Sequence, residues 1–322
     1  MAGVLTVPAP RDRRAGRLAR LLGTRIAASV VVLWAAVTAV FFLLRLMPGN
    51  TVDVLLARSQ VSPQVRAQVI AAYRLDGSVG TQYLAYLGRV LTGDLGESYV
   101  LREPVATAIG QQLPDSLALL AATMVITVVA SVVLAILGAS RRPWVRSSFT
   151  AVESLASSVP PFWLGLLLLT VFSFTLHWFP AIGSGGLPGL VLPSIALAAS
   201  AVAVVTRVLR EGLLHALEEP FVVTARARGT GELAVRFRHV LRHALLPVTT
   251  ILGWMAGSLI GGAVIVEIVF SRAGIGRLTL SAVQNRDMPV VTGVVLLAAV
   301  IFVVVNILVD VLNWIVDPRT RG

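Results

Sequence analysis

The segment Leu117–Ala139 reads LALLAATMVITVVASVVLAILGA and contains 23 consecutive residues without a charged side chain. A helix rises 1.5 Å per residue and needs about 20 apolar residues to cross the hydrocarbon core of a bilayer. The segment therefore predicts a membrane-spanning helix. The whole chain of 322 residues agrees, since 56% of its residues are hydrophobic, 13% are charged and the mean hydropathy is +0.84. We expect an all-α membrane protein.

Further apolar runs of similar length lie on both sides of this segment. They are Ile26–Leu46, Leu155–Phe179, Leu190–Leu209, Leu246–Phe270 and Val290–Val316. Together with the first segment they predict six transmembrane helices, the third of which is interrupted by Pro160 and Pro161. An even number of spans places both termini on the same side of the membrane.

The distribution of arginine predicts which side that is. All 27 basic residues are arginine, and eighteen lie in residues 1–25, the loop after the second span, the stretch 207–242 and the C-terminal tail. The connection 180–189, on the opposite side, has no charge. Because basic residues are retained on the cytoplasmic side of short loops, both termini are predicted to be cytoplasmic. The net charge of +11 then reflects topology and contact with anionic lipid, and it does not indicate nucleic-acid binding.

These spans define the expected organisation of the chain. Residues 1–25 form a basic cytoplasmic N-terminus, and residues 26–322 form a single transmembrane domain. The external connection 47–116 is too long for a simple loop and should contain helices. It is either an amphipathic cap over the outer mouth of the bundle or a loop that follows the membrane surface.

The cytoplasmic connection 210–245 is the second long one. Its pattern predicts two short helices, Glu219–Arg228 and Glu232–Ala244, separated by Gly229-Thr230-Gly231. Gly229 suits a left-handed helix end, and Glu232 places a carboxylate near the positive end of the next helix. A solvated basic loop explains the charges, but two helices around a glycine hinge favour a site where another protein docks.

Small residues recur every four positions in the fifth predicted span. Gly253, Gly257 and Gly261 form the repeat, with Ser258 and Gly262 beside them. Such a face lets another helix backbone approach closely. It predicts a packed interface or part of a gated pathway, either inside the bundle or with a partner subunit.

Charged residues within spans are costly, so each one needs a physical reason. Glu267 lies near the external end of the fifth span, and Asp310 shares a face of the sixth with Asn306. We interpret all three as packing or capping residues rather than as contacts for a substrate. His239 and His243 are four residues apart but stand among arginines, so we assign no metal site.

The residues that are missing exclude several kinds of chemistry. The chain has no Cys and no Lys, which excludes thiolate nucleophiles, Schiff bases and the phosphate-binding loop that ends in Lys. No catalytic motif is visible, so we assign no catalytic residue and no cofactor to this chain. If the protein uses ATP and magnesium, another polypeptide must bind them.

Eight short segments, in order from about Leu18 to Arg321, resemble the inner-membrane permeases of ABC importers for dipeptides, oligopeptides and nickel. The likeness is to the first permease of the pair in such systems. The segments are Arg45-Leu46-Met47-Pro48-Gly49, Gly93-Asp94-Leu95-Gly96, Pro161-Phe162-Trp163-Leu164-Gly165, Thr224-Ala225-Arg226-Ala227-Arg228-Gly229, Arg238-His239 through Ala244-Leu245-Leu246-Pro247, Val266-Glu267 with Phe270 and Gly274-Ile275-Gly276, Arg286-Asp287 with Pro289-Val290-Val291, and Asp317-Pro318-Arg319.

The resemblance implies a role for the cytoplasmic connection, whose first helix would lie in a groove of an ATPase. The implied contact residues are Val223, Thr224, Ala225, Arg226, Ala227, Arg228, Gly229 and Arg236. Ala225 and Gly229 keep the small residues of the family consensus, whereas Val223 replaces its glutamate and Thr224 its first alanine. Arg226 and Arg228 are then expected to meet acidic groups of the ATPase. Asn50, Ala273 and the segment 77–80 also depart from the family pattern and affect local loop shape.

The resemblance also implies the assembly and its location. We expect a multi-pass protein of a bacterial or archaeal cytoplasmic membrane, paired with a second homologous permease, two ATPase subunits or domains and an external substrate-binding lipoprotein. Gly253, Gly257, Ser258 and Gly261 would pack or line the pathway. A self-sufficient secondary transporter or channel is the alternative. The sequence does not distinguish a dipeptide, an oligopeptide or a nickel complex as substrate.

Overall fold

The computed structural model describes residues 11–46, 63–64, 67, 77–98, 100–140, 142–181, 186–285 and 287–316. Its named elements are all helices. They are α1 (Arg11–Leu46), α4 (Val79–Leu91), α5 (Val105–Gly138), α6 (Pro143–Ser158), α7 (Pro161–Leu168), the π-helix η1 (Leu169–Thr175), α8 (Pro188–Ala216), α9 (Pro220–Ala227), α10 (Glu232–Ala234), the π-helix η2 (Val235–Val240), α11 (Leu241–Val269), α12 (Ile275–Gln284) and α13 (Met288–Val316). The expected all-α fold is confirmed over the described residues.

Four helices are long and apolar enough to cross a membrane. They are α1, α5, α8 and α13, which cover the first, second, fourth and sixth predicted spans. Many apolar side chains of α1 are exposed, among them Val30 at 60% and Trp34 at 52%. In water this exposure would be costly, whereas the hydrocarbon core of a bilayer accepts it.

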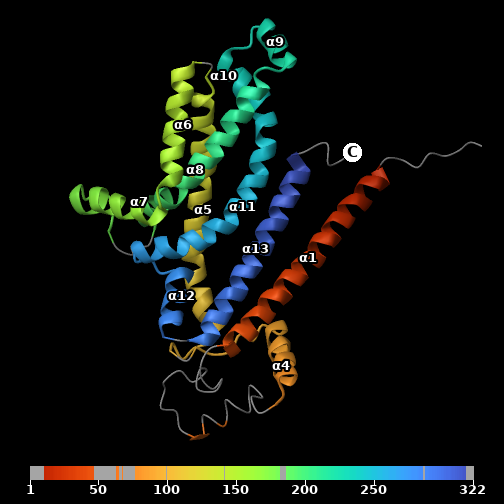
Figure 1. Ribbon diagram of the computed structural model, residues 1–322, viewed down its shortest axis with the longest axis vertical. Coiled ribbons are helices and arrows are strands. Elements are labelled where there is room, and N and C mark those ends of the chain that lie inside the picture. Colours follow the sequence, from red (N-terminus) through yellow and green to blue (C-terminus); the bar gives the residue numbers. More distant parts are fainter. Residues whose placement is uncertain are drawn as a thin grey trace, which may run out of the picture.

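The third predicted span is not a single helix. The chain breaks at Pro160 and Pro161, and the two parts, Pro143–Ser158 and Pro161–Thr175, meet at an angle of 95°. Pro160 has extended backbone angles (φ −63°, ψ 136°), as expected for a residue that precedes another proline. The predicted interruption at Pro160 and Pro161 is confirmed, whereas the predicted bounds Leu155–Phe179 were wrong, because α6 begins at Pro143 and α7 leaves in a new direction. Figure 1 shows α7 projecting sideways from the bundle.

The cytoplasmic connection also differs from the prediction. α9 is a short helix as expected, but the second helix does not end at Ala244. It continues from α10 through η2 into α11, so that one helical path runs from Glu232 to Val269. Within this path η2 has π-helical bonding, which widens the helix by part of a residue per turn without ending it. The fifth predicted span thus has no separate beginning at Leu246.

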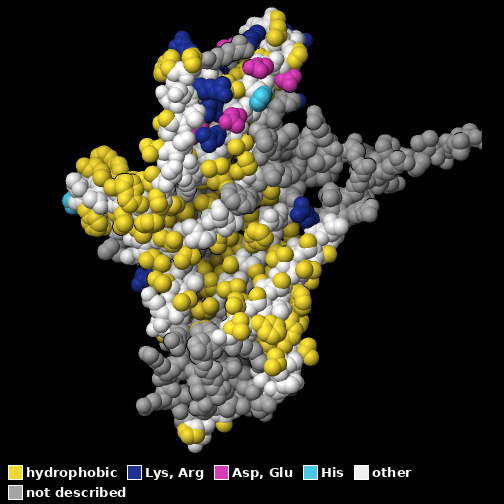
Figure 2. All heavy atoms as spheres, in the orientation of Figure 1, with side chains coloured by type: hydrophobic (Ala, Val, Ile, Leu, Met, Phe, Trp, Pro, Cys, Tyr) yellow, Lys and Arg dark blue, Asp and Glu magenta, His cyan; other side chains and the backbone are white. Residues whose placement is uncertain are grey.

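The helices form an elongated bundle around the contact of α5 with α8 (Figure 1). Small buried residues such as Ser131 and Ala201 lie at this contact, where Ser131 Oγ donates to Val202 O at 3.3 Å, and they allow the two backbones to approach. α9 lies at one end of the bundle and α12 at the other (Figure 1). The N-terminal end of α1 and the C-terminal end of α13 are both directed toward the α9 end. Figure 2 shows charged side chains gathered near α9 and hydrophobic ones over the middle of the visible face.

Residues 47–116, predicted to form an external cap, are only partly described. α4 is its one long described helix, and its Tyr83 hydroxyl forms a 2.7 Å hydrogen bond with Thr38 of α1. Phe41 of α1 packs against the rings of Tyr83 and Tyr86. These contacts attach α4 to the outer end of α1. The predicted helix that opens at Ser62-Pro63 lies mostly outside the described residues.

Candidate functional site

α9 is the helix that the sequence indicated as a docking element. Pro220 supplies the first helical residue, where its missing N–H is not needed. Val222 and Ala225 face the bundle and are buried, which anchors the helix in the core that also contains Leu213 and Val235. The opposite face is exposed.

Most of the residues predicted to contact an ATPase are exposed, either on one face of α9 or in the two residues that follow the helix. They are Val223, Thr224, Arg226, Ala227, Arg228 and Gly229. Val223 is 65% exposed, an unusual position for a large apolar side chain beside so many arginines. Ala225 does not belong to this face, because it packs inward. Its small size therefore serves the fit of α9 against its own bundle.

Gly229 ends α9 in the left-handed conformation, with φ +81°. Its N–H donates to Arg226 O at 2.9 Å, and the N–H of Thr230 donates to Ala225 O at 3.2 Å. These two bonds are the pair expected when a helix ends in a left-handed glycine, and they satisfy carbonyls that would otherwise lack partners. The predicted left-handed conformation of Gly229 is confirmed.

Arg226 bridges the hinge that Gly229 creates. Its Nε and Nη2 donate to the two carboxylate oxygens of Glu232 at 2.7 and 3.1 Å. These hydrogen bonds raise the pKa of Arg226 above its ordinary value. The pair joins α9 to α10 from the solvent side, so Arg226 already has an acidic partner within the chain. Arg228 is the neighbouring exposed cation.

Arg236 points away from this face. Its Nη1 donates to the carbonyl of Ile136 at 2.7 Å, in the last turn of α5. A guanidinium at a helix C-terminus satisfies a free carbonyl and complements the helix dipole. Among the described atoms its Nε has no hydrogen-bond partner. The structure thus gives Arg236 a contact inside the chain, which ties the connection to α5.

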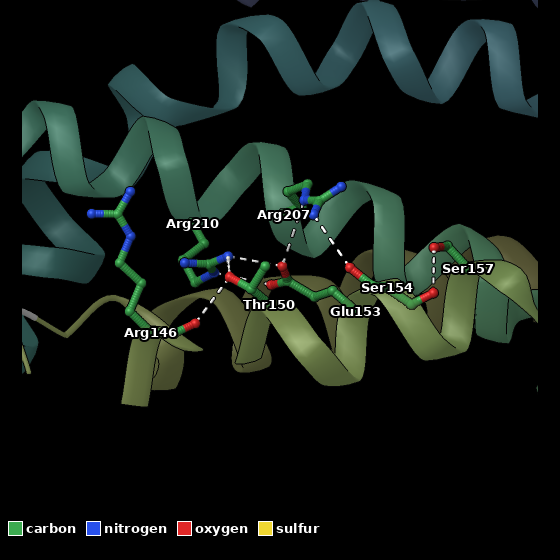
Figure 3. Close-up of polar contacts among 7 residues, drawn as sticks. All are labelled: Arg146, Thr150, Glu153, Ser154, Ser157, Arg207 and Arg210. Atoms are coloured by element: carbon green, nitrogen blue, oxygen red, sulfur yellow. Dashed lines mark hydrogen bonds and ion pairs between the residues drawn. The ribbon is translucent and has the colours of Figure 1, made fainter. Parts of the chain in front are cut away.

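A buried ion pair that the sequence did not reveal joins α6 to α8. Arg210 donates from Nε and Nη2 to the carboxylate of Glu153 at 3.0 and 2.8 Å, and also to Thr150 Oγ1 at 3.2 Å (Figure 3). The two charged side chains are 2% and 5% exposed. Arg207 lies at the edge, 3.9 Å from Glu153 and 3.4 Å from Ser154 Oγ (Figure 3). Since α8 is followed directly by α9, this pair lies on the helix that leads to α9.

The glycines of the small-residue face contact different neighbours. A Cβ on Gly253 would lie 2.7 Å from Val309 Cγ1, and one on Gly257 would lie 3.3 Å from the ring of Phe302, so both face α13. Gly262 faces α8 through Leu197. Gly261 is exposed, and a Cβ added there would meet no described atom within 4 Å; Ser258 is exposed as well. Gly253 and Gly257 therefore pack inside the bundle, whereas Ser258 and Gly261 lie at its surface.

Glu267 holds the turn between α11 and α12. It is 1% exposed, and it accepts hydrogen bonds from Ser116 Oγ at 2.5 Å and from Gly276 N at 2.7 Å. Ser116 Oγ in turn accepts the N–H of Ile275 at 2.8 Å. Ile275 and Gly276 are the first two residues of α12, so Glu267 and Ser116 satisfy donors that the helix leaves free. This geometry fits the capping role expected for Glu267.

The turn fits around this carboxylate because it contains glycine. A Cβ on Gly274 would collide with the carboxylate of Glu267, and one on Gly276 would collide with the backbone of Val264. Any larger residue would displace the carboxylate or the backbone. Asn306 is also described, and its Nδ2 donates to Phe302 O within the same helix at 2.8 Å. The side chains of Asp310 and His243 lie outside the described residues.

A second carboxylate holds the loop that precedes α5. Asp287 is 1% exposed and accepts hydrogen bonds from the Ser98 hydroxyl and from the N–H of Val100, the latter at 3.3 Å. Arg272 donates to Gly189 O at 2.9 Å. Segments that are far apart in the sequence are thus joined at the end of the bundle opposite α9.

The chain belongs to the family of binding-protein-dependent transport system inner membrane components, whose model matches residues 128–322. This match and the relatives below identify the chain as an inner-membrane permease of an ABC importer. Relatives extend over nearly the whole chain. A putative peptide transport system permease of Brucella abortus (strain 2308) is 34% identical over 310 residues, which cover 94% of this chain and 98% of that protein.

Two further relatives carry more specific names. A di/tripeptide transport system permease of Pseudomonas aeruginosa is 34% identical over 310 residues, covering 87% of this chain and 92% of the relative. A glutathione transport system permease of Salmonella paratyphi A is 35% identical over 309 residues, covering 94% and 98%. Among solved structures, a chain of the inward-facing MetNI methionine ABC transporter matches with a TM-score of 0.55 and 16% identity. It covers 65% of this chain and 96% of its own length, and it supports the fold.

Proposed function

We propose that this chain is the permease subunit of an ABC importer for peptides or closely related small solutes. Relatives named for peptide, di/tripeptide and glutathione transport support this substrate class. The observation that carries the proposal is α9, a short helix that is anchored by two buried residues and exposes an arginine-rich face at one end of a membrane bundle.

In the proposed arrangement six spans cross the membrane, with both termini and α9 in the cytoplasm. α1, α5, α8, α11 and α13 supply five of them, and the bent pair α6 and α7 supplies the sixth. The arginines near α9 favour this orientation. Residues 47–116 then form an external cap, and residues 210–245 form the cytoplasmic coupling connection.

The partners in this proposal are a second homologous permease, two ATPase subunits or domains that bind ATP and magnesium, and an external substrate-binding lipoprotein. The exposed face of α9 would lie in a groove of one ATPase. Closure of the ATPase pair would then move α9, and α8 with it, so that the pathway between the two permeases alternates between outward and inward access.

Three contacts would transmit this movement. The pair of Arg226 with Glu232 keeps α9 fixed against α10, and Arg236 attaches the connection to α5. Arg210 with Glu153 then carries α6 along with α8. A polar contact at each junction lets the docking helix move the bundle as one body, since a connection with free joints would absorb the displacement.

The experiment is uptake of labelled di- and tripeptides, graded in length, by cells that lack their own peptide importers. The complete set of partner genes is expressed with or without this chain, and nickel is tested in parallel. Peptide uptake that requires this chain supports the proposal. Equal uptake without the chain, or uptake of nickel alone, contradicts the proposed substrate class.

A further inference from the structure

A cavity of about 240 Å³ lies between α5, α11, α12 and α13, beside the turn that Glu267 holds. Its walls are apolar and include Leu117, Ile260, Val264 and Ile301. Gly261 also lines it, and because this residue is exposed, the cavity opens at the surface of the bundle. Among the described residues that line the cavity, Glu267 is the one ionisable group.

Among the described residues the carboxylate of Glu267 forms no direct ion pair, and the charge of Arg272 acts on it only at longer range. Its hydrogen bonds come from a hydroxyl and from backbone N–H groups, all of which are neutral. The nearby guanidinium of Arg272 is directed to Gly189 O and, at 3.4 Å, to Asp115. The amino end of α12 contributes only partial positive charge. A buried carboxylate in these surroundings is stabilised when a cation binds next to it.

The dimensions of the cavity restrict the kind of cation. An apolar cavity of about 150 Å³ can hold a benzene molecule, so about 240 Å³ accommodates an aliphatic or aromatic side chain together with an ammonium group. A bare metal ion would leave the apolar walls without contacts, and the cavity offers it a single carboxylate. A ligand with an ammonium group next to an apolar side chain matches both parts of the cavity. This is the chemistry of the first residue of a peptide.

We propose that this cavity is a subsite for the N-terminal residue of a transported peptide, with the ammonium on Glu267 and the apolar side chain against α5, α11 and α13. The inference rests on the proposed function and adds a place where the permease itself contacts its substrate. Glu267 would then have two roles, because it caps α12 and receives the ligand with its remaining lone pairs.

The test uses the fact that the chain has no cysteine. A Gly261→Cys variant introduces a single thiol at the mouth of the cavity, at a position where a Cβ meets nothing within 4 Å. The matched control is Gly110→Cys, an exposed position on α5 that is equally open and does not line the cavity. The assembled transporter is treated with N-ethylmaleimide, and labelling of this chain is followed by mass spectrometry with Leu-Ala or with N-acetyl-Leu-Ala present.

We expect Leu-Ala to slow labelling of the Gly261→Cys variant, with no effect of the acetylated peptide and no protection of the Gly110→Cys control. Adding Glu267→Gln keeps an acceptor for Gly276 and a donor for Ser116, so it preserves the cap while removing the charge. Half-protection should then need about tenfold more Leu-Ala, as expected when a charge-assisted hydrogen bond becomes a neutral one.

Three results would overturn the subsite. They are equal protection by the acetylated peptide, protection that is unchanged by Glu267→Gln, and a Gly261→Cys thiol that Leu-Ala does not protect or the reagent does not reach. Each leaves the proposed function intact if the same preparation still imports peptides with ATP. Loss of import in the unmodified transporter would instead count against the proposed function.

Discussion

Arg210 and Glu153 connect α8 to α6 through two hydrogen bonds of 3.0 and 2.8 Å, and both side chains are almost completely buried (Figure 3). Moving one helix away from the other would break these hydrogen bonds and separate two oppositely charged groups. The two helices should therefore move as a unit when α9, which follows α8, is displaced.

The first prediction concerns this pair. Replacing one partner, as in Arg210→Met or Glu153→Leu, should destabilise the protein by about 3–5 kcal/mol, because the remaining charge stays buried. Combining the two replacements should recover most of that loss, since an apolar pair can fill the same site. The measurement is thermal unfolding of the purified protein in detergent. Arg207→Ala is the control and should cost about 1 kcal/mol or less, because that side chain is 46% exposed.

A double variant that is less stable than both single variants would contradict the interpretation of Arg210 and Glu153 as a pair.

The second prediction concerns Gly229. Gly229→Ala forces a side chain into the left-handed region and should cost about 1 kcal/mol, and Gly229→Pro also removes the N–H that donates to Arg226 O. Both should weaken co-purification of the ATPase subunits while α5 and α8 remain folded. Gly231→Ala is the matched control, because Gly231 has an ordinary φ of −66° and equally open surroundings. Equal co-purification by the Gly229→Pro variant and the control would refute the role of the hinge.

The third prediction concerns the packing of α11 on α13. Gly253→Ala places a methyl group 2.7 Å from Val309 Cγ1, and the resulting overpacking should cost about 1–3 kcal/mol. Val309→Ala in the same chain should restore part of the loss by making room. Gly261→Ala, where a Cβ has open space within the helix, should not lower the unfolding temperature. No difference between the alanines at 253 and 261 would show that the two helices are not in close contact.

The fourth prediction concerns the cap of α12. Ser116→Ala removes the acceptor for the N–H of Ile275 and one donor to Glu267, so the first turn of α12 should loosen by about 1–3 kcal/mol. Hydrogen exchange at the amides of Ile275 and Gly276 should accelerate accordingly. Ser258→Ala serves as the comparison, because Ser258 is exposed and bonds only within its own helix, to Met255 O. Unchanged exchange in the Ser116→Ala variant would mean that the cap does not hold the turn.

Part of the fold follows directly from local sequence. The uncharged run Leu117–Ala139 has no favourable place except a membrane, and it lies within α5 and its C-terminal cap residue Ala139. Gly229 could be assigned a left-handed conformation because it separates two helical patterns and lacks a Cβ. In both cases the physical cause lies within a few residues of the feature.

The bend between α6 and α7 was only half visible in the sequence. Two adjacent prolines must interrupt a helix, since neither has an N–H and the first is forced into an extended conformation. The angle of 95°, however, depends on how α6 packs along α8, which no local signal specifies.

The polar network of the site was the least predictable part. Arg210 and Glu153 are 57 residues apart, and the arginine resembled one more basic residue near the cytoplasm. The sequence nevertheless contained one signal for this pair. Glu153 lies two residues before the apolar run that begins at Leu155, so a helix that continues into that run would bury Glu153 and require a partner for its charge. Similarly, Arg226 was expected to be free for an ATPase, and only the turn at Gly229 brings it to Glu232.

We propose that this chain moves peptides only as part of an ATP-driven assembly. The decisive experiment is uptake of a labelled dipeptide into proteoliposomes that contain this chain alone, or this chain with the second permease, the ATPases and the binding protein, each with and without ATP. We expect uptake in the complete assembly with ATP and in no other sample. Dipeptide accumulation by the chain alone, without ATP, would contradict it and would indicate a self-sufficient transporter or channel.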